Sequence, residues 1–285
     1  MVKWFCEKDV PGKRKGNQKV MLRIEKVVFK GKTKYQKVFI FDNAMYGRIL
    51  TLDGIIEFSE ADEFIYHEMI VHPLMFSLKK PERILIIGGG DGGALREVLK
   101  HSVKKVDVVE MDPQIIEISK KYLKFVSKGS FKDERVEVFE GRGEEFLKEC
   151  EGVYDGIIVD STGPNEYGRP LLSKRFYSIA SKALKKGGIL STLVSSFIDF
   201  NEIIKPTYRN AKKFFKYVTL MRVTIPSYNC GEYCFMLMSN SVNVEKPSIR
   251  MLERKFEKFN AKESLKFYTP KVHVASLILP PIWRI

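Results

Sequence analysis

Residues 84–87, Ile-Leu-Ile-Ile, run directly into residues 88–93, Gly-Gly-Gly-Asp-Gly-Gly, and then into residues 94–99, Ala-Leu-Arg-Glu-Val-Leu. Apolar residues that favour strands, a glycine cluster and an amphipathic run predict a buried strand, a tight turn and a helix. Glycines let the backbone approach a ligand closely, and the N–H groups at a helix start favour acidic or polar ligand atoms. We therefore expect a ligand to bind at this turn.

An acidic residue follows the next predicted strand, residues 106–109 (Val-Asp-Val-Val). Glu110 lies twenty residues beyond Gly90, at the spacing where a carboxylate typically accepts hydrogen bonds from both hydroxyls of a ribose. A ligand that contains adenosine is therefore the first hypothesis.

The glycine pattern by itself leaves the kind of nucleotide open. Gly88, Gly90 and Gly93 fit the GxGxxG spacing that would suggest NAD, but this spacing alone has low specificity. Asp91 within the cluster would repel a pyrophosphate and attract a cation. A sulfonium nucleotide of the S-adenosylmethionine type fits the turn better than NAD.

From residue 83 onward, strand-like segments alternate with helical patterns. The predicted helices include residues 114–123, 173–184 and 202–215. The predicted strands are residues 84–87, 106–110, 136–139, 157–160, 189–194, 218–225 and 233–238. This alternation predicts an α/β fold with a doubly wound, mainly parallel sheet, and the last two strands, with no helix between them, form an antiparallel edge pair. We predict a methyltransferase-type Rossmann-like fold.

The N-terminal part has a different pattern. Residues 21–58 contain short alternating segments separated by turn residues, which predicts a small antiparallel β-unit. Residues 59–62 resemble a helix capping box, and Pro73 is expected to disturb the helix that follows. We predict two domains, an N-terminal β-strand domain at residues 1–70 and a Rossmann-like catalytic domain at residues 71–285.

A second acidic residue ends the predicted strand of residues 157–160. An isolated aspartate in this position more often caps the next turn than serves a site. However, ligands in open α/β sheets bind at the carboxyl ends of the strands, where Gly88, Glu110 and Asp160 are expected to line one crevice. This placement favours a functional role for Asp160.

Composition narrows the class of protein. The 285 residues are 44% apolar, which is enough for one large core or for one core with a small second domain. Neither a signal sequence nor a membrane span is apparent, so we expect a cytoplasmic location. Four scattered cysteines lack zinc-site spacing, so we expect no metal. The net charge of +14 is spread along the chain, which disfavours nucleic acid and also fits the lysine- and glutamate-rich surface of a heat-adapted protein.

Several motifs together are typical of one family. The most specific are Asp-Glu-Phe-Ile-Tyr-His-Glu-Met (62–69) and the glycine block (86–93). The others are Trp-Phe-Cys-Glu (4–7), Lys-Tyr-Gln-Lys-Val (34–38), Leu-Asp-Gly-Ile-Ile (52–56), Leu-Arg-Glu-Val (95–98), Thr-Ile-Pro-Ser-Tyr (224–228) and His-Val-Ala (273–275). With these motifs the chain resembles, over essentially its whole length, the spermidine synthases or polyamine aminopropyltransferases.

The resemblance implies an N-terminal β-domain and a reaction on decarboxylated S-adenosylmethionine as a co-substrate, with no prosthetic group. The aminopropyl group would pass to an amine, putrescine first, and leave spermidine and methylthioadenosine. It also implies a homodimer or homotetramer. The polyamine substrate is a small molecule, so neither nucleic acid nor a membrane is an expected partner.

The resemblance also assigns roles to residues. Asp160 would take the proton of the attacking amine. Asp91 would hold the ammonium of the aminopropyl group. The residues implied for the nucleoside are Gln36, Gly88, Gly90, Glu110, Arg142 and Gly143. The residues implied for the acceptor are Tyr66, His67, Ser161, Gly163 and Tyr228. The three ring side chains in the last set have a plainer alternative as core aromatics or a structural histidine, and Trp4 is either a lid or a packing residue.

Three positions depart from the family pattern. Gly163 stands where the family usually has an aspartate that helps hold the diamine, and Leu193 replaces a position that is often polar. Arg142 stands where an acidic or amide side chain usually meets the adenine amino group, and arginine cannot accept a hydrogen bond. Agmatine, cadaverine and spermidine therefore remain alternative acceptors. A methyltransferase, a non-catalytic homologue and, remotely, a nucleic-acid binder remain alternative functions.

Overall fold

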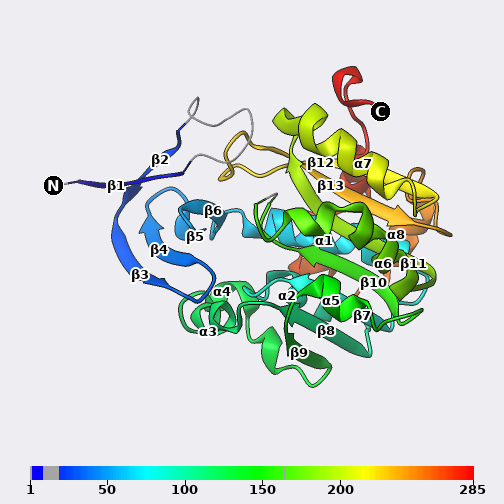
Figure 1. Cartoon of the computed structure of the whole chain (residues 1–285), viewed down its shortest axis with the longest axis horizontal. Coiled ribbons are helices and arrows are strands. Elements are labelled where there is room, and N and C mark those ends of the chain that lie inside the picture. Colours follow the sequence, from blue (N-terminus) through cyan, green and yellow to red (C-terminus); the bar gives the residue numbers. More distant parts are fainter. Residues whose placement is uncertain (1, 9–18, 164) are drawn as a thin grey trace.

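The computed structural model describes residues 2–8, 19–163 and 165–285 of the chain. The strands in these residues form a two-stranded, a four-stranded and a seven-stranded sheet. Figure 1 shows the two small sheets at the N-terminal end of the molecule and the large sheet, surrounded by helices, towards the other end. The predicted N-terminal domain includes residues 1 and 9–18, which lie outside the described part.

The two small sheets are antiparallel, as predicted. The first pairs β1 (Lys3–Cys6) with β2 (Met21–Ile24), and β1 adds a strand that we did not expect. The second sheet follows the chain order β3 (Lys26–Lys32), β4 (Lys37–Asn43), β5 (Gly47–Leu52) and β6 (Ile55–Ser59). Turn residues such as Gly54, with a φ of 86°, reverse the chain between these strands.

The large sheet confirms the predicted fold class. Its order is β12-β13-β11-β10-β7-β8-β9, with β13 antiparallel to both neighbours and the remaining neighbours parallel. The strands are β7 (Arg83–Gly88), β8 (Lys105–Glu110), β9 (Val136–Glu140), β10 (Tyr154–Asp160), β11 (Leu184–Ser196), β12 (Tyr217–Thr224) and β13 (Glu232–Ser239). All seven predicted strands are present, and the last two form the predicted antiparallel edge.

Helices cover both faces of this sheet. They are α1 (Glu63–Ser77), α2 (Gly93–Leu99), α3 (Pro113–Tyr122), α4 (Lys124–Ser127), α5 (Gly143–Leu147), α6 (Lys174–Ala183), α7 (Lys205–Ala211), α8 (Ile249–Glu257) and α9 (Pro270–Ser276). A π-helical turn, Phe200–Ile204, precedes α7, and short 3-10 turns complete the set. Among the described helices, none is long and apolar enough to cross a membrane.

The strand that precedes the glycine turn divides the core into two parts. Ile84 and Ile86 of β7 belong to the apolar cluster that includes α1 and α2, whereas Leu85 and Ile87 belong to the cluster that includes α6. This division follows from the two-residue period of a strand, which points successive side chains to opposite faces. Because both faces are covered, the strand is apolar throughout.

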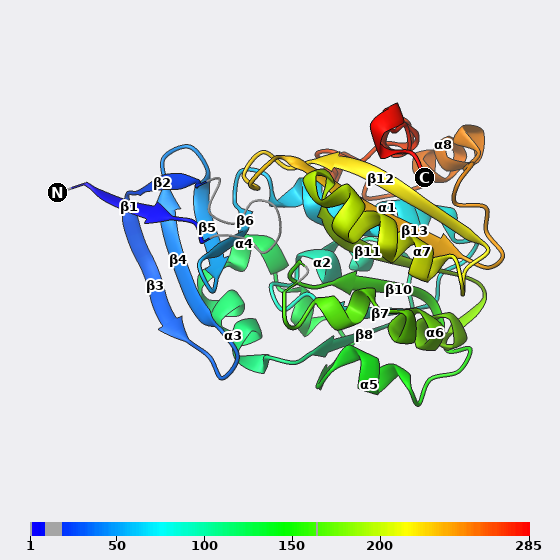
Figure 2. The ribbon, with the colours of Figure 1, turned by 45° about the horizontal axis from the view of Figure 1, so that its top comes forward.

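A third apolar cluster joins the N-terminal sheet to the large domain. Ile40 and Leu50 of the four-stranded sheet pack against Ile115 of α3 and Val126 of α4. Figure 2 shows these helices lying between the four-stranded sheet and the rest of the α/β domain. This packing sets the direction from which the N-terminal sheet reaches the carboxyl ends of the large sheet.

Two predictions about α1 were wrong. Pro73 lies inside the helix without ending it, because every residue of α1 except Phe64 is buried and the surrounding packing outweighs one missing hydrogen bond. Residues 59–62 do not form a capping box. Instead, the Asp62 carboxylate accepts hydrogen bonds from the backbone and hydroxyl of Ser227 at 2.7 and 2.8 Å, which fixes the β12–β13 loop to the start of α1.

Candidate active site

The turn after β7 lies against the end of β10. Asp160 pairs with Gly88 in the parallel register, and the Gly89 N–H donates to the Asp160 carbonyl oxygen at 2.7 Å. Gly88 has a φ of 82°, and a Cβ atom there would lie 2.0 Å from the same oxygen, so a larger residue would force the strands apart. The glycine cluster thereby brings Asp160 beside the predicted ligand turn.

Asp91 projects from this turn and is fixed at one oxygen. Its Oδ1 accepts a hydrogen bond from the Gly93 N–H at 2.6 Å and lies 3.3 Å from Nε2 of His67. A Cβ atom on Gly93 would lie 2.3 Å from the His67 ring, so this glycine permits the close approach of α1 and α2. Burial opposes ionisation, but the charge and hydrogen bond of His67, the Gly93 N–H and the charge of Arg96 together outweigh it and lower the pKa of Asp91.

His67 lies between two carboxylates. Its Nδ1 is 2.5 Å from Glu63, one turn earlier on α1, and Glu63 accepts hydrogen bonds at 3.1 and 3.0 Å from the Arg96 guanidinium on α2. Burial disfavours the charged ring, but Asp91 and Glu63 outweigh it and raise the pKa of His67 to about 10. Both ring nitrogens of His67 face carboxylates. His67 therefore influences the cavity through its contact with the Asp91 carboxylate.

Asp160 has one occupied and one open carboxylate oxygen. The residue is only 7% exposed, and its Oδ1 accepts a hydrogen bond from the Tyr66 hydroxyl at 2.8 Å. Its Oδ2 is buried without a hydrogen-bond partner in the described part of the chain. Burial and the charge of Asp91 raise the pKa of Asp160 to about 6, against the opposing effects of His67 and Tyr66. The site therefore holds a buried carboxylate with one oxygen available for a proton.

Two further carboxylates lie where β8 ends. Glu110 accepts a hydrogen bond from the Asp112 N–H at 2.8 Å. The Asp112 carboxylate accepts hydrogen bonds from Thr33 at 2.6 Å and from the Gln36 amide at 3.1 Å, so the β3–β4 turn is joined to this edge. Burial is the main reason that the pKa of Glu110 rises to about 7.

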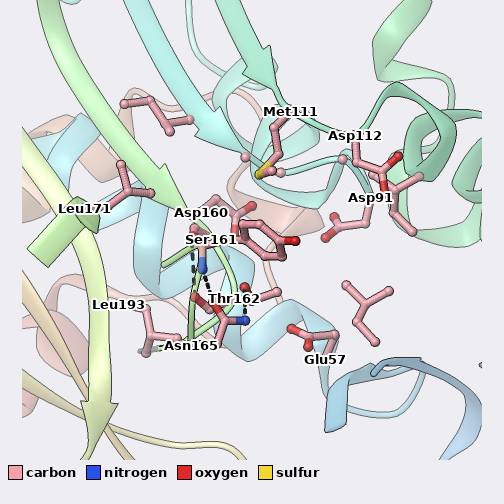
Figure 3. Close-up of a pocket in the computed structure, with 18 of the residues that line it drawn as sticks. Glu57, Asp91, Met111, Asp112, Asp160, Ser161, Thr162, Asn165, Leu171 and Leu193 are labelled. Atoms are coloured by element: carbon pink, nitrogen blue, oxygen red, sulfur yellow. Dashed lines mark hydrogen bonds between the residues drawn. The ribbon is translucent and has the colours of Figure 1, made fainter. Parts of the chain in front are cut away.

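His67 and the four carboxylates of Asp91, Glu110, Asp112 and Asp160 line one cavity of about 290 Å³. Figure 3 shows Asp112 on one side of it and Glu57 and Asn165 on the other, with Asp91 and Asp160 between them. The structure brings together every predicted site residue. The thirteen that line the cavity are Gln36, Tyr66, His67, Gly88, Gly90, Asp91, Glu110, Arg142, Gly143, Asp160, Ser161, Gly163 and Tyr228.

The cavity also contains carboxylates that sequence reasoning missed. Asp112 lies two residues beyond Glu110, just before α3, and its acidic side chain at a strand end was a usable signal. Glu57 lies on β6 and reaches the cavity from the N-terminal sheet. Its motif was noticed but its carboxylate was not, because the sequence does not show which way β6 faces.

The three departures from the family pattern lie at the two ends of the cavity. A Cβ atom on Gly163 would meet no atom within 4 Å, so this part of the cavity is open. Leu193 lines the same cavity from β11. Arg142 is exposed at the N-cap of α5 and also lines the cavity.

His67, Asp91 and Asp160 also have the spacing of a metal site. Their potential ligand atoms lie within 4.8 Å of one another. A histidine must be neutral to bind a metal, and the ion pairs on both sides of His67 stabilise its protonated form. The arrangement therefore suits organic cations better than a metal ion.

Comparisons with known proteins agree with this geometry. The family model described as the spermine/spermidine synthase domain matches residues 63–247, and the model of the spermidine synthase tetramerisation domain matches residues 3–60. The chain is 40% identical to spermidine synthase 1 of Pisum sativum over 265 residues, which cover 91% of this chain and 78% of that protein. It is 36% identical to spermine synthase of Arabidopsis thaliana over 298 residues, covering 99% of this chain and 82% of that one.

A solved structure is also similar over nearly the whole chain. It is a spermidine synthase in complex with the transition-state analogue AdoDATO, with a TM-score of 0.91 and 35% identity, covering 98% of this chain and 93% of that chain. A spermidine synthase from Thermotoga maritima has a TM-score of 0.88 and 34% identity, with 98% and 92% covered. The chain belongs to the spermine/spermidine synthase family of aminopropyltransferases.

Proposed function

We propose that the protein transfers the aminopropyl group of decarboxylated S-adenosylmethionine to putrescine and releases spermidine and methylthioadenosine. The order of acidic groups along one cavity carries this proposal, with Asp112 and its neighbour Glu110 at one side, Asp91 and Asp160 between, and Glu57 opposite. A ribose, an aminopropyl ammonium and a diamine laid end to end need hydrogen-bond acceptors in this order.

The nucleoside would bind at the Glu110 end. A Cβ atom on Gly90 would lie 3.1 Å from Oε2 of Glu110, so the glycine turn and this carboxylate face each other. Both ribose hydroxyls would donate to Glu110, and the polar side chains of Asp112 and Gln36 would border the adenosine. The binding of AdoDATO by the similar spermidine synthase supports this placement.

The aminopropyl group would extend towards Asp91. Only one oxygen of this carboxylate is held by the Gly93 N–H and His67, which leaves the other for an ammonium. His67 offsets part of the charge of Asp91 and thereby keeps the carboxylate ionised within a buried site. The ammonium would then fix the carbon next to the sulfonium at a constant distance from Asp160.

Asp160 would serve as the general base. An amine attacks only as the neutral species, so a carboxylate must take its proton, and Oδ2 of Asp160 is open for that proton. The amine lone pair forms a bond to the carbon next to the sulfur, the carbon–sulfur bond breaks, and its electron pair stays on sulfur. The sulfonium becomes a neutral thioether, which is methylthioadenosine. The Tyr66 hydroxyl holds the carboxylate in place through Oδ1.

Putrescine is the proposed acceptor because spermidine synthases are among the most similar relatives. Spermidine is the second candidate, since the Arabidopsis thaliana spermine synthase matches 99% of the chain. Agmatine and cadaverine also have two cationic ends and remain in the test. The open space beside Gly163 accommodates any of these amines.

The decisive experiment measures methylthioadenosine after incubation with decarboxylated S-adenosylmethionine and each of these four amines. We expect methylthioadenosine to be released with putrescine, at the highest kcat/KM of the four amines. S-adenosylmethionine in place of the decarboxylated form, with S-adenosylhomocysteine as the product that is measured, tests the methyltransferase alternative. Absence of methylthioadenosine with every amine would overturn the proposal and favour a non-catalytic homologue.

We also propose that the chain forms a homodimer or homotetramer through its N-terminal sheets. Residues 3–60 match the tetramerisation domain, and exposed apolar side chains gather in this part of the chain, namely Val2, Trp4, Met21, Val27 and Met45. Light scattering on the purified protein, with Trp4→Ser as a variant expected to weaken the assembly, tests this proposal.

A further inference from the structure

Glu57 is an acid on β6 that faces the cavity. Its neighbours Ile56 and Phe58 are buried in apolar clusters and Glu57 is half-buried, and all three line the cavity. Figure 3 shows its carboxylate pointing into the cavity, on the side of Asn165 and away from Asp112. It therefore lies at the end where the acceptor would bind, beyond Asp160.

The backbone around Glu57 is held from two directions. Its carbonyl oxygen accepts a short hydrogen bond from the Tyr228 hydroxyl, and the Ile56 N–H donates to the Glu7 carboxylate at 3.0 Å. These contacts join β6 to the β12–β13 loop and to the end of β1. The backbone position of Glu57 is consequently fixed by the fold.

Among the described residues, the charged groups that influence the Glu57 carboxylate are other acids. In the described part of the chain it forms neither a hydrogen bond nor an ion pair. Burial, and then the charges of Glu7, Asp91, Asp160 and Asp53, raise the pKa of Glu57 to about 8. A cationic ligand would relieve this repulsion. The second observation that points to such a ligand is Oδ2 of Asp160, which is buried without a described partner and belongs to the same cavity.

Gly163 adds no charge at this end of the cavity. The resemblance implies an aspartate at this position that helps to hold the diamine, but among the described residues none lies within 4 Å of a Cβ atom built on Gly163. Leu193 lines the cavity with an apolar side chain and adds no charge. Among the described residues at this end of the cavity, Glu57 is a carboxylate that could take over the missing role.

We propose that Glu57 binds the far ammonium of the acceptor and thereby selects amines with two cationic ends over monoamines. The near nitrogen lies at Asp160 and the alkyl chain lies along Leu193 and the Tyr66 ring, so the second nitrogen reaches the Glu57 end of the cavity. Apolar walls between two carboxylates match an alkyl diammonium. This inference rests on the proposed aminopropyl transfer.

The test compares Glu57→Gln with the native protein, using putrescine and butylamine as acceptors. Butylamine has the same chain length but lacks the far ammonium. For putrescine we expect KM to rise by at least about tenfold with kcat nearly unchanged, the scale of one hydrogen bond to a charged group. For butylamine both constants should stay within about twofold, since the lost charge had no partner in that complex.

Two controls keep the result interpretable. Glu57→Asp retains the charge and should restore most of the preference for putrescine. Glu60→Gln removes an exposed charge three residues away and should leave KM and kcat unchanged for both acceptors. Native affinity of Glu57→Gln for methylthioadenosine shows that the variant is folded. Equal losses with both amines, or no change with either, would overturn this inference. If the native protein released no methylthioadenosine with any amine, the proposed function itself would fail instead.

Discussion

The hydroxyl of Tyr66 donates a hydrogen bond to Oδ1 of Asp160 at 2.8 Å, and this contact divides the carboxylate into a held and an open oxygen. The phenol stabilises the ionised form, while burial and Asp91 favour the protonated form. The resulting pKa of about 6 leaves Asp160 ionised at pH 7 and more basic than an exposed aspartate. A general base needs both properties.

Asp160→Asn tests the assignment of the base directly. The amide has nearly the same size but cannot accept a proton, so we expect kcat to fall by at least about a hundredfold. The binding of methylthioadenosine and the thermal midpoint should stay close to native values. A variant with near-native kcat would remove Asp160 from this role.

The acid side of the pH profile should report Asp160. Since the reaction needs the ionised carboxylate, kcat/KM for butylamine should decline as the pH falls through about 6. Butylamine with saturating decarboxylated S-adenosylmethionine is used for this profile, because the proposed contacts of Glu57 and Glu110 then do not contribute to it. In Tyr66→Phe the hydrogen bond that favours the ionised form is lost, so this decline should move to higher pH. Tyr177→Phe is the matched control, because that buried hydroxyl has no described partner and lies in α6. Identical profiles in both variants would contradict this explanation.

Glu110 should make nucleoside binding depend on pH. Its pKa is about 7 without ligand, and ribose hydroxyls that donate to the carboxylate favour the ionised form. Binding therefore lowers this pKa and releases protons, so the affinity for methylthioadenosine should weaken as the pH falls below about 7. Calorimetry in buffers of different ionisation enthalpy measures the protons released. Glu110→Gln should bind more weakly and lose the pH dependence in this range, and an unchanged dependence would count against the ribose contact.

Gly163→Asp should supply a second anionic anchor for the acceptor. A new Cβ atom meets nothing within 4 Å, and the φ of Gly163 lies outside the left-handed region, so the aspartate fits without strain. We expect the ratio of kcat/KM for putrescine to that for butylamine to rise severalfold. An unchanged ranking of acceptors would show that this position does not select the amine.

The sequence predicted the parts of the site that depend on local order. Asp91, Glu110 and Asp160 each follow or end an apolar strand, and parallel strands of one sheet bring their carboxyl ends together, so their meeting could be foreseen. Glu57 could not, because its direction depends on how the N-terminal sheet packs on α3 and α4. The prediction that Pro73 would disturb α1 was wrong for a similar reason, since tertiary packing outweighs the loss of one helical hydrogen bond at the proline.

The charged contacts behind the site were equally hidden from the sequence. Glu63 and Arg96 are 33 residues apart and meet only because α1 and α2 cross beside the glycine turn. The motifs that contain Glu63 and Arg96 were both recognised, but the contact between these two residues was not predicted. Whether the domain boundary lies near residue 70 stays a prediction.

Glu63→Gln should reveal how much this buried contact stabilises the fold. The substitution leaves the charged side chains of Arg96 and His67, which are 9% and 1% exposed, with one fewer carboxylate. We expect the free energy of unfolding to fall by about 3–5 kcal/mol, as when one partner of a buried ion pair is removed. Chemical unfolding monitored by circular dichroism measures this change at pH 7.

The pH dependence of that loss follows from the pKa of Glu63, which His67 and Arg96 lower against the effect of burial. A carboxyl with a lowered folded-state pKa stabilises the protein above its unfolded pKa and loses this effect as the pH falls further. The difference between native protein and variant should therefore shrink below about pH 4. Glu117→Gln is the control, since its pair with Lys120 is 73% exposed at the glutamate and worth less than about 1 kcal/mol. A loss in Glu63→Gln no larger than in this control would show that α1 and α2 are held together by apolar packing alone.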